Sequence, residues 1–163
     1  MKRKKMNNKG FTLVELIVVL VILAILAAIL VPTLLGYIER AKSEKDYSTA
    51  QTVRVAMQSA IAEAYAKDAN GEITLDEIPY ASVWKLVGAT VDSSDKTKAT
   101  LDGVPIQIDK ANCAIENNQL TKVTVVINGS SYRYSSTEIA GTGNVETQTA
   151  NTWMALPKST GNN

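Results

Sequence analysis

Residues 10–35 read GFTLVELIVVLVILAILAAILVPTLL, and this stretch decides the fold of the N-terminal part of the chain. From residue 11 to residue 35, 21 of the 25 side chains are apolar. As a helix this segment would be about 37 Å long, at about 1.5 Å per residue, and the hydrocarbon core of a bilayer is about 30 Å thick. The segment therefore predicts one membrane-spanning helix.

The charges on the two sides of this segment are unequal. The first ten residues contain five lysines and arginines and no acid, whereas residues 11–163 contain 12 basic and 16 acidic residues. Because basic flanks stay in the cytoplasm, we expect the N-terminus inside and the rest of the chain outside the cell. The acidic balance beyond residue 10 provides no basic face, so charge-driven binding of nucleic acid is not expected.

The composition excludes several kinds of catalytic and metal site. The 163 residues contain no histidine and one cysteine, Cys113. Zinc sites of His and Cys, the Ser-His-Asp triad and the Cys-His dyad lack their residues, and an intramolecular disulfide lacks a second cysteine. We expect no cofactor and expect Cys113 to be a buried, inert thiol.

Two other classes, penicillin-binding enzymes and proteins with an ordinary signal peptide, are suggested by short patterns that are incomplete here. Ser-x-x-Lys strings at residues 82–85 and 93–96 occur in penicillin-binding proteins, but the companion motifs of that fold are absent. We therefore do not expect an enzyme. No small-x-small sequence directly follows Val31, and the nearest, at residues 60–62, lies in a helical pattern, so ordinary signal-peptide cleavage is not expected.

Glu15 is the one charged residue inside the apolar segment. A carboxylate in a membrane-spanning helix costs on the order of 2.5–3.5 kcal/mol even on a permissive insertion scale, so it usually has a partner and a function. The alternative is that Glu15 lies near the lipid headgroups and is merely tolerated there.

The residues around Glu15 carry a resemblance to a known family. Lys9-Gly10-Phe11-Thr12-Leu13-Val14-Glu15-Leu16, followed at once by the apolar run, resembles the class III signal of type IV pilins and pseudopilins. The resemblance implies that a prepilin peptidase cuts between Gly10 and Phe11 and that Phe11 is then N-methylated. Glu15 becomes the fifth residue of the mature chain, where the family has a Glu.

The same resemblance implies a function and a set of partners. In the family this Glu is thought to pair with the N-terminal amine of an adjacent subunit. We therefore expect a homopolymeric type IV pilus, built from the membrane by an assembly platform and its ATPase and used for adhesion, twitching motility or surface contact. The alternatives are a pseudopilin of a type II secretion or DNA-uptake machine and, less favoured, a membrane-anchored binding domain.

Pro32 interrupts the apolar run and predicts a kink in the helix. Pilins often have a proline at this distance from the cut, and an ordinary membrane-helix kink explains it equally well. Many family members also have a glycine eight residues earlier, where this chain has Ala24.

The rest of the chain predicts an α+β fold in four segments. These are a leader (1–10), an apolar helix (11–38), its amphipathic continuation (39–67) and a head (68–163). A stripe of Val53, Met57 and Ile61 at helical spacing should pack on the head, and the helix should run from Phe11 to Lys67, with Asn70-Gly71 as a left-handed stop after it.

The start of the head contains a partial match to a calcium loop. The candidate ligands are Asp68, Asn70, Glu72 and Glu77. Ala66 stands where an EF-hand loop has its first Asp, so our prediction is that no metal binds. The alternative is a turn at Asn70-Gly71, with Thr74-x-x-Glu77 as a capping box that opens a short helix.

Residues 79–135 predict a second short helix and an antiparallel sheet. The helix should span residues 79–87 and end at Gly88, and the sheet should span residues 101–135, with hairpin turns at Asp102-Gly103 and Asn128-Gly129. Trp84, Trp153 and Leu156 are candidates to complete the core. Residues 136–163 predict surface loop with one edge strand.

Overall fold

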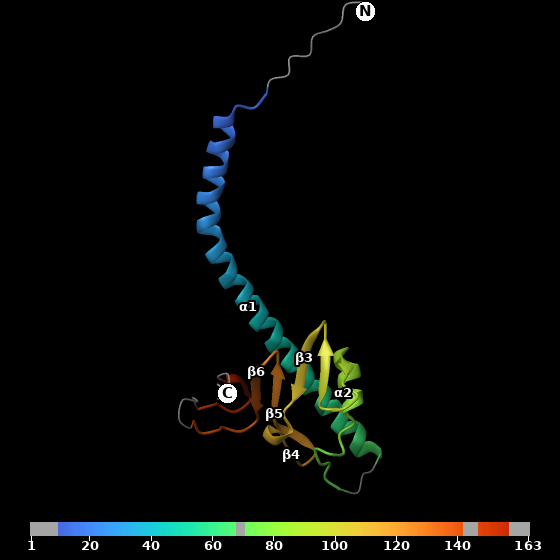
Figure 1. Cartoon of the computed structure of the whole chain (residues 1–163). Helices are drawn as coiled ribbons and strands as arrows, with labels where there is room; N and C mark the ends of the chain where they lie inside the picture. Colours follow the sequence, from blue (N-terminus) through green and yellow to red (C-terminus); the bar gives the residue numbers. More distant parts are fainter. Residues whose placement is uncertain (1–9, 68–70, 142–146, 157–163) are drawn as a thin grey trace, which may run out of the picture. The chain divides into compact units, whose positions relative to one another are not determined.

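The computed structural model describes residues 10–67, 71–141 and 147–156. The chain divides into two units, residues 1–43 and residues 44–163. Helix α1 (Leu13–Lys67) begins in the first unit and ends in the second. The helix was predicted to begin at Phe11 and begins two residues later, at Leu13. It ends at Lys67, as predicted (Figure 1). The predicted turn at Asn70-Gly71 lies partly outside the described residues.

α1 stays helical through Pro32, so no unwinding occurs at the proline. A proline deprives the carbonyl four residues earlier of its N–H donor. The hydroxyl of Thr33 lies beside this gap and donates to the carbonyls of Ile29 and Leu30, at 3.4 and 2.8 Å. Such back-bonding by Thr helps an apolar helix to accommodate a proline. The kink itself remains a prediction.

The C-terminal half of α1 provides one wall of the hydrophobic core of the second unit. Its buried residues recur at helical spacing: Ala50, Val53, Ala56, Met57, Ala60 and Ile61. Val53, Met57 and Ile61 are fully buried, which confirms the predicted stripe.

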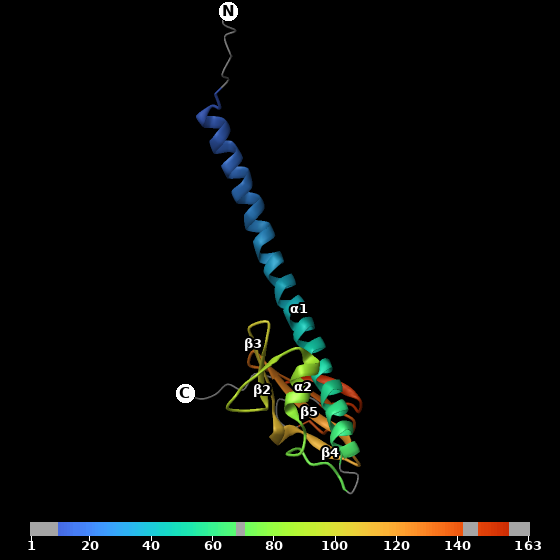
Figure 2. The ribbon, with the colours of Figure 1, turned by 90° about the vertical axis from the view of Figure 1, so that its right-hand side faces the viewer.

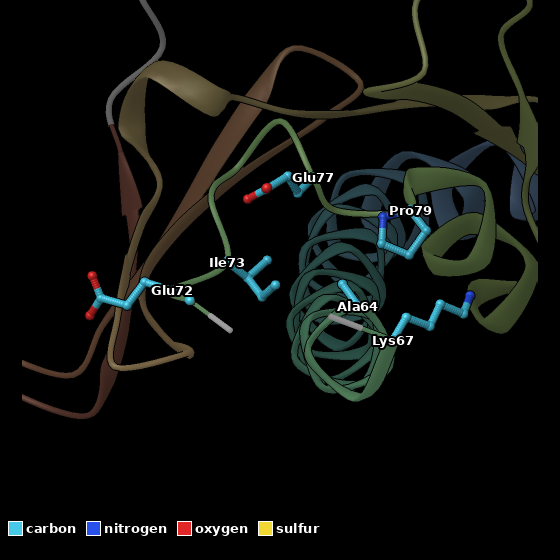
Figure 3. A pocket seen from close by; sticks show the side chains of 7 residues that line it. Ala64, Lys67, Glu72, Ile73, Glu77 and Pro79 are labelled. Carbon is cyan, nitrogen blue, oxygen red and sulfur yellow. The ribbon is translucent and has the colours of Figure 1, made fainter. Parts of the chain in front are cut away.

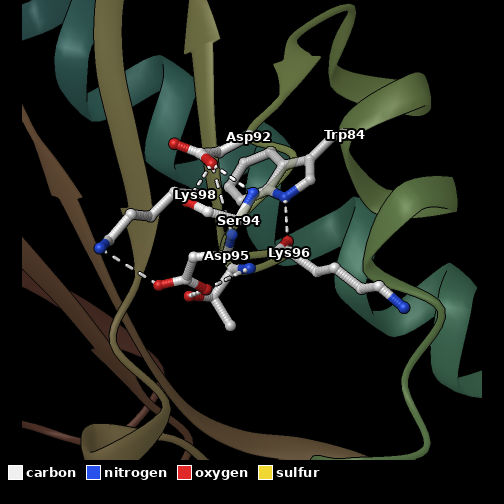
Figure 4. Close-up of polar contacts among 7 residues, drawn as sticks. Trp84, Asp92, Ser94, Asp95, Lys96 and Lys98 are labelled. Atoms are coloured by element: carbon white, nitrogen blue, oxygen red, sulfur yellow. Dashed lines mark hydrogen bonds and ion pairs between the residues drawn. The ribbon is translucent and has the colours of Figure 1, made fainter.

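Helix α2 (Tyr80–Val87) follows Pro79 and ends at Gly88, as predicted. Gly88 has φ 79°, a left-handed conformation that glycine adopts without strain. Trp84 is fully buried, and its indole N–H donates to the carbonyl of Lys96 at 2.7 Å (Figure 4). Figure 2 shows α2 next to the C-terminal half of α1.

The described residues contain one antiparallel sheet of seven strands, in the order β1-β2-β3-β5-β6-β7, with β4 paired to β5. The strands are β1 (Thr90–Val91), β2 (Lys98–Leu101), β3 (Val104–Ile108), β4 (Ala114–Glu116), β5 (Gln119–Ile127), β6 (Ser130–Ser135) and β7 (Thr152–Leu156). A short 3-10 helix, η1 (Lys110–Asn112), precedes β4. The sheet is therefore wider than the predicted span of 101–135, and β7 is the expected edge strand.

Two tight turns set the register of the sheet. Asp102-Gly103 joins β2 to β3 with φ values of 51° and 79°, and Asn128-Gly129 joins β5 to β6 with 48° and 77°. Two successive left-handed residues match the twist of paired strands, and Asx-Gly sequences supply them at low cost. Both predicted turns are confirmed.

The alternating side chains of the sheet complete the core of the second unit. Ile106, Ile108, Val123, Val125 and Ile127 are buried in the same cluster as α1 and α2. Trp153 is half-buried against this cluster and Leu156 is half-buried. The long helix packed on a small antiparallel sheet confirms the α+β class.

A pair of substitutions on α1 tests this packing. Met57→Ala should lower the free energy of unfolding by about 2–5 kcal/mol, because it leaves a cavity in the core. Val55→Ala is the matched control, since Val55 is 64% exposed, and it should change stability by about 0.5 kcal/mol or less. Urea unfolding of the detergent-solubilised chain, followed by tryptophan fluorescence, measures both. Equal losses in the two variants would contradict the described orientation of α1.

Candidate assembly and processing site

The residues around the predicted cut precede the first turn of α1. Gly10, Phe11 and Thr12 are non-helical and exposed, and the side chain of Phe11 is 85% exposed. No helical hydrogen bonding has to be broken to reach the peptide bond between Gly10 and Phe11. This geometry suits a peptidase substrate, while the cleavage itself remains a prediction.

Thr12 and Glu15 cap the start of α1 reciprocally. The Oε2 atom of Glu15 accepts hydrogen bonds from the backbone N–H and the hydroxyl of Thr12, at 2.9 and 2.8 Å. The backbone N–H of Glu15 lies 3.3 Å from the Oγ1 of Thr12 and donates to it. This is the capping-box arrangement, which satisfies N–H groups that the first turn of a helix leaves without partners.

The capping box commits one carboxylate oxygen of Glu15. Within the described part of the chain the other oxygen, Oε1, makes no hydrogen bond. Glu15 therefore has a partner, Thr12, just before its own helix, and its free oxygen can accept a second donor. The role of Thr12 was missed from the sequence, although Thr12-x-x-Glu15 is the same pattern that we recognised at Thr74-x-x-Glu77.

The apolar side chains that follow Glu15 are uncovered. The first half of α1 contains a window long and apolar enough to cross a membrane, and none of that window is buried by the described residues. Leu16, Leu20, Leu23 and Leu30 each expose more than half of their surface. Exposed apolar surface of this extent indicates a site that lipid or other protein covers.

Two of the calcium-ligand candidates bind backbone groups of the chain instead. Oε1 of Glu72 accepts the N–H of Asn117 at 2.9 Å, and Oε2 of Glu77 accepts the N–H and hydroxyl of Thr74, both at 2.7 Å. Figure 3 shows the carboxylate of Glu72 directed away from Glu77. Asp68 and Asn70 lie outside the described residues. Among the residues that are described, no three His, Cys, Asp or Glu side chains are grouped to hold a metal.

The box at Thr74 and Glu77 differs from our expectation in one respect. Its hydrogen bonds form, and they lower the pKa of the Glu77 carboxyl. The bond from the backbone N–H of Thr74 has the largest effect, and the bond from the Thr74 hydroxyl has the next largest. Residues 75–77, however, form a single turn and not a helix. Pro79 follows within two residues, and the residue before a proline is disfavoured in the helical region.

The cavity beside this turn measures about 400 Å³ and is lined by Ala64, Lys67, Gly71, Glu72, Ile73, Glu77 and Pro79 (Figure 3).

The second Ser-x-x-Lys string lies in a loop that is ordered by carboxylates. Asp92 accepts the N–H and hydroxyl of Ser94, at 2.7 and 2.6 Å, and Asp95 accepts the same two groups of Thr97, at 3.0 and 2.6 Å (Figure 4). The hydroxyl bond from Ser94, followed by its N–H bond, lowers the pKa of Asp92. These contacts fix the path of the loop.

Cys113 is buried, as predicted. Its thiol donates to the carbonyl of Asp109 at 3.2 Å. Burial raises the pKa of the thiol to about 11, so the reactive thiolate is scarce at neutral pH.

Substitution of Thr12 tests the capping box. Thr12→Ala should destabilise the first turn of α1 by about 0.5–2 kcal/mol. The substitution removes the hydroxyl that binds the carboxylate and the backbone N–H of Glu15. Thr12→Ser keeps the hydroxyl and is the control. Amide exchange of residues 13–16 in detergent micelles, measured by NMR, should accelerate in the alanine variant alone. Equal exchange in Ala and Ser variants would contradict the cap.

Comparison with known proteins adds one match at this site. The family described as prokaryotic N-terminal methylation motif matches residues 5–31, which include Gly10, Phe11, Thr12 and Glu15. Neither the curated proteins nor the solved structures contain a match to the chain. The chain carries this methylation motif, and its long apolar N-terminal helix fits the type IV pilin and pseudopilin family.

Proposed function

We propose that the chain is a pilin, the structural subunit of a type IV pilus. It is cut between Gly10 and Phe11, methylated on the new amine of Phe11, and polymerised through the apolar half of α1. The filament acts in adhesion, motility or surface contact. The single observation that carries the proposal is the apolar half of α1 beside Glu15: none of the described residues covers it, and the methylation motif matches it.

The cut changes the electrostatics at the start of α1. Hydrolysis of the Gly10–Phe11 bond creates an ammonium four residues before Glu15. An amine and a carboxylate are each costly in an apolar environment when alone and are tolerable as a pair. Oε2 of Glu15 is held by Thr12, so the proposed partner of Oε1 is the amine of a neighbouring subunit. Such a pair favours one register of helix against helix.

The proposal assigns a role to each segment. Residues 1–10 are a cytoplasmic leader that the prepilin peptidase removes. Residues 11–38 lie in the membrane before assembly and in the filament core after it, residues 39–67 continue the helix, and residues 68–163 form the head on the cell surface. The assembly platform and its ATPase move the helix from lipid into the homopolymer.

The size of the head favours a pilus subunit over a pseudopilin. Residues 68–163 supply seven strands and polar C-terminal loops in the described part. A pseudopilin of a secretion or DNA-uptake machine shares the same N-terminal segment, so that segment supports both. The motif supports a structural protein of the pilin type.

Substitution of Glu15 tests the proposal. Glu15→Gln should reduce filament material sheared from cells at least about tenfold, because it removes the charge that attracts the amine, a loss of roughly 1.4 kcal/mol or more per subunit contact. The amount of processed subunit in the membrane should stay the same. The control is Glu39→Gln, which removes an exposed carboxylate on the same helix outside the apolar segment.

Immunoblots of sheared and membrane fractions measure both pools. An unchanged filament yield in Glu15→Gln would contradict the proposed role of Glu15 in assembly. Loss of the subunit from the membrane would instead assign Glu15 to insertion or stability.

A further inference from the structure

Gln148 is a buried polar side chain in a polar segment that the proposed function does not use. The side chain is 1% exposed, although its neighbours Thr147 and Thr149 are exposed. A buried side-chain amide is compatible with a stable fold when its hydrogen-bonding groups have partners, and it destabilises the fold when they do not. The partners of Gln148 therefore show why it is buried.

The side-chain amide of Gln148 bridges the last two strands of the sheet. Its Nε2 donates to the carbonyls of Arg133 on β6 and Thr152 on β7, at 3.1 and 2.9 Å. Its Oε1 accepts the Nε–H of Arg133 at 2.8 Å. Both N–H donors and the oxygen are used, and the two carbonyl partners fix the orientation of the amide.

The backbone of Gln148 closes the loop between these strands. Gln148 and Ile139 exchange both backbone hydrogen bonds, each at 2.9 Å. One residue therefore joins the outgoing part of the loop to its returning part and joins both to β6. The two backbone bonds therefore fix residues 139 and 148, in the two described parts of the loop, to one another.

The opposite face of β7 is attached by aromatic contacts. Trp153 contacts Tyr134 of β6, with ring centroids 5.7 Å apart, and Tyr47 of α1, at 6.1 Å. The guanidinium of Arg54 lies 3.7 Å above the ring of Tyr134. The Nε of Arg54 is buried without a hydrogen-bond partner in the described residues, so the ring is the contact that holds this group.

We infer that Gln148 is a non-covalent clamp that holds the C-terminal segment (residues 136–141 and 147–156) on the edge of β6, and that this segment opens as a unit when the clamp is removed. Opening would release β7 and expose the edge of β6, while α1, α2 and β1–β5 stay folded. Partial opening of this kind is expected at the edge of a sheet, where β7 pairs with β6 alone. The clamp needs no disulfide and is therefore independent of the redox state. The inference does not rest on filament assembly.

Hydrogen exchange of the full chain in detergent micelles tests the clamp. Gln148→Met keeps the volume and removes all three side-chain hydrogen bonds. Peptides that cover β6, β7 and residues 136–141 should exchange about 10- to 100-fold faster, because buried carbonyls and an Arg N–H lose their partners. Peptides from α1 and from β2 and β3 should be unchanged. Gln119→Met, at an exposed position on β5, is the matched control.

A second variant decides the matter if Gln148→Met does not fold. Arg133→Met removes one of the three bonds and leaves the two carbonyl partners of Gln148 in place. The same peptides should accelerate, by less than in Gln148→Met. Unchanged exchange in the C-terminal segment, or equal acceleration throughout the chain, would overturn the inference.

Discussion

The constraint on which the rest of the structure depends is the uncovered apolar surface of the first half of α1. Each leucine, isoleucine or valine left in water costs about 1.5–3 kcal/mol relative to full burial. With 21 apolar residues among residues 11–35, the total is on the order of tens of kcal/mol. The described chain offers no surface that covers this segment. Only a membrane or other protein can therefore cover it, and the N-terminal methylation motif, residues 5–31, lies at its start.

Glu15 connects this constraint to chemistry. A carboxylate without partners is costly in an apolar segment. The capping box gives one oxygen of Glu15 two donors, the N–H and the hydroxyl of Thr12. The helix start is thereby fixed at Leu13, and the bond before Phe11 stays outside the helix. The second oxygen makes no hydrogen bond within the described residues, and we propose that it accepts one from a neighbouring subunit. Glu15 thus defines the helix terminus, and in our proposal the same side chain also pairs with a neighbouring subunit.

Much of this arrangement could be predicted from local sequence patterns. The Val53, Met57 and Ile61 stripe, the αL residue Gly88 and the two Asx-Gly turns depend on nearby residues and were predicted correctly. β1 and β4 are two and three residues long and are too short to show a periodicity of their own, so only their pairing with the next longer strands, β2 and β5, identifies them. Gln148 was missed because a glutamine in a Thr-rich segment indicates surface, and its partners on β6 become neighbours only in the folded sheet.

The central claim is that processing at Phe11 converts a membrane-bound chain into a filament subunit. The most direct measurement is the mass of the N-terminal peptide of polymeric material sheared from wild-type cells. The account predicts a peptide that begins at Phe11 and is one methyl group heavier than its sequence. A chain that begins at Met1 and is found in the membrane alone would contradict it, because α1 would then be an ordinary anchor.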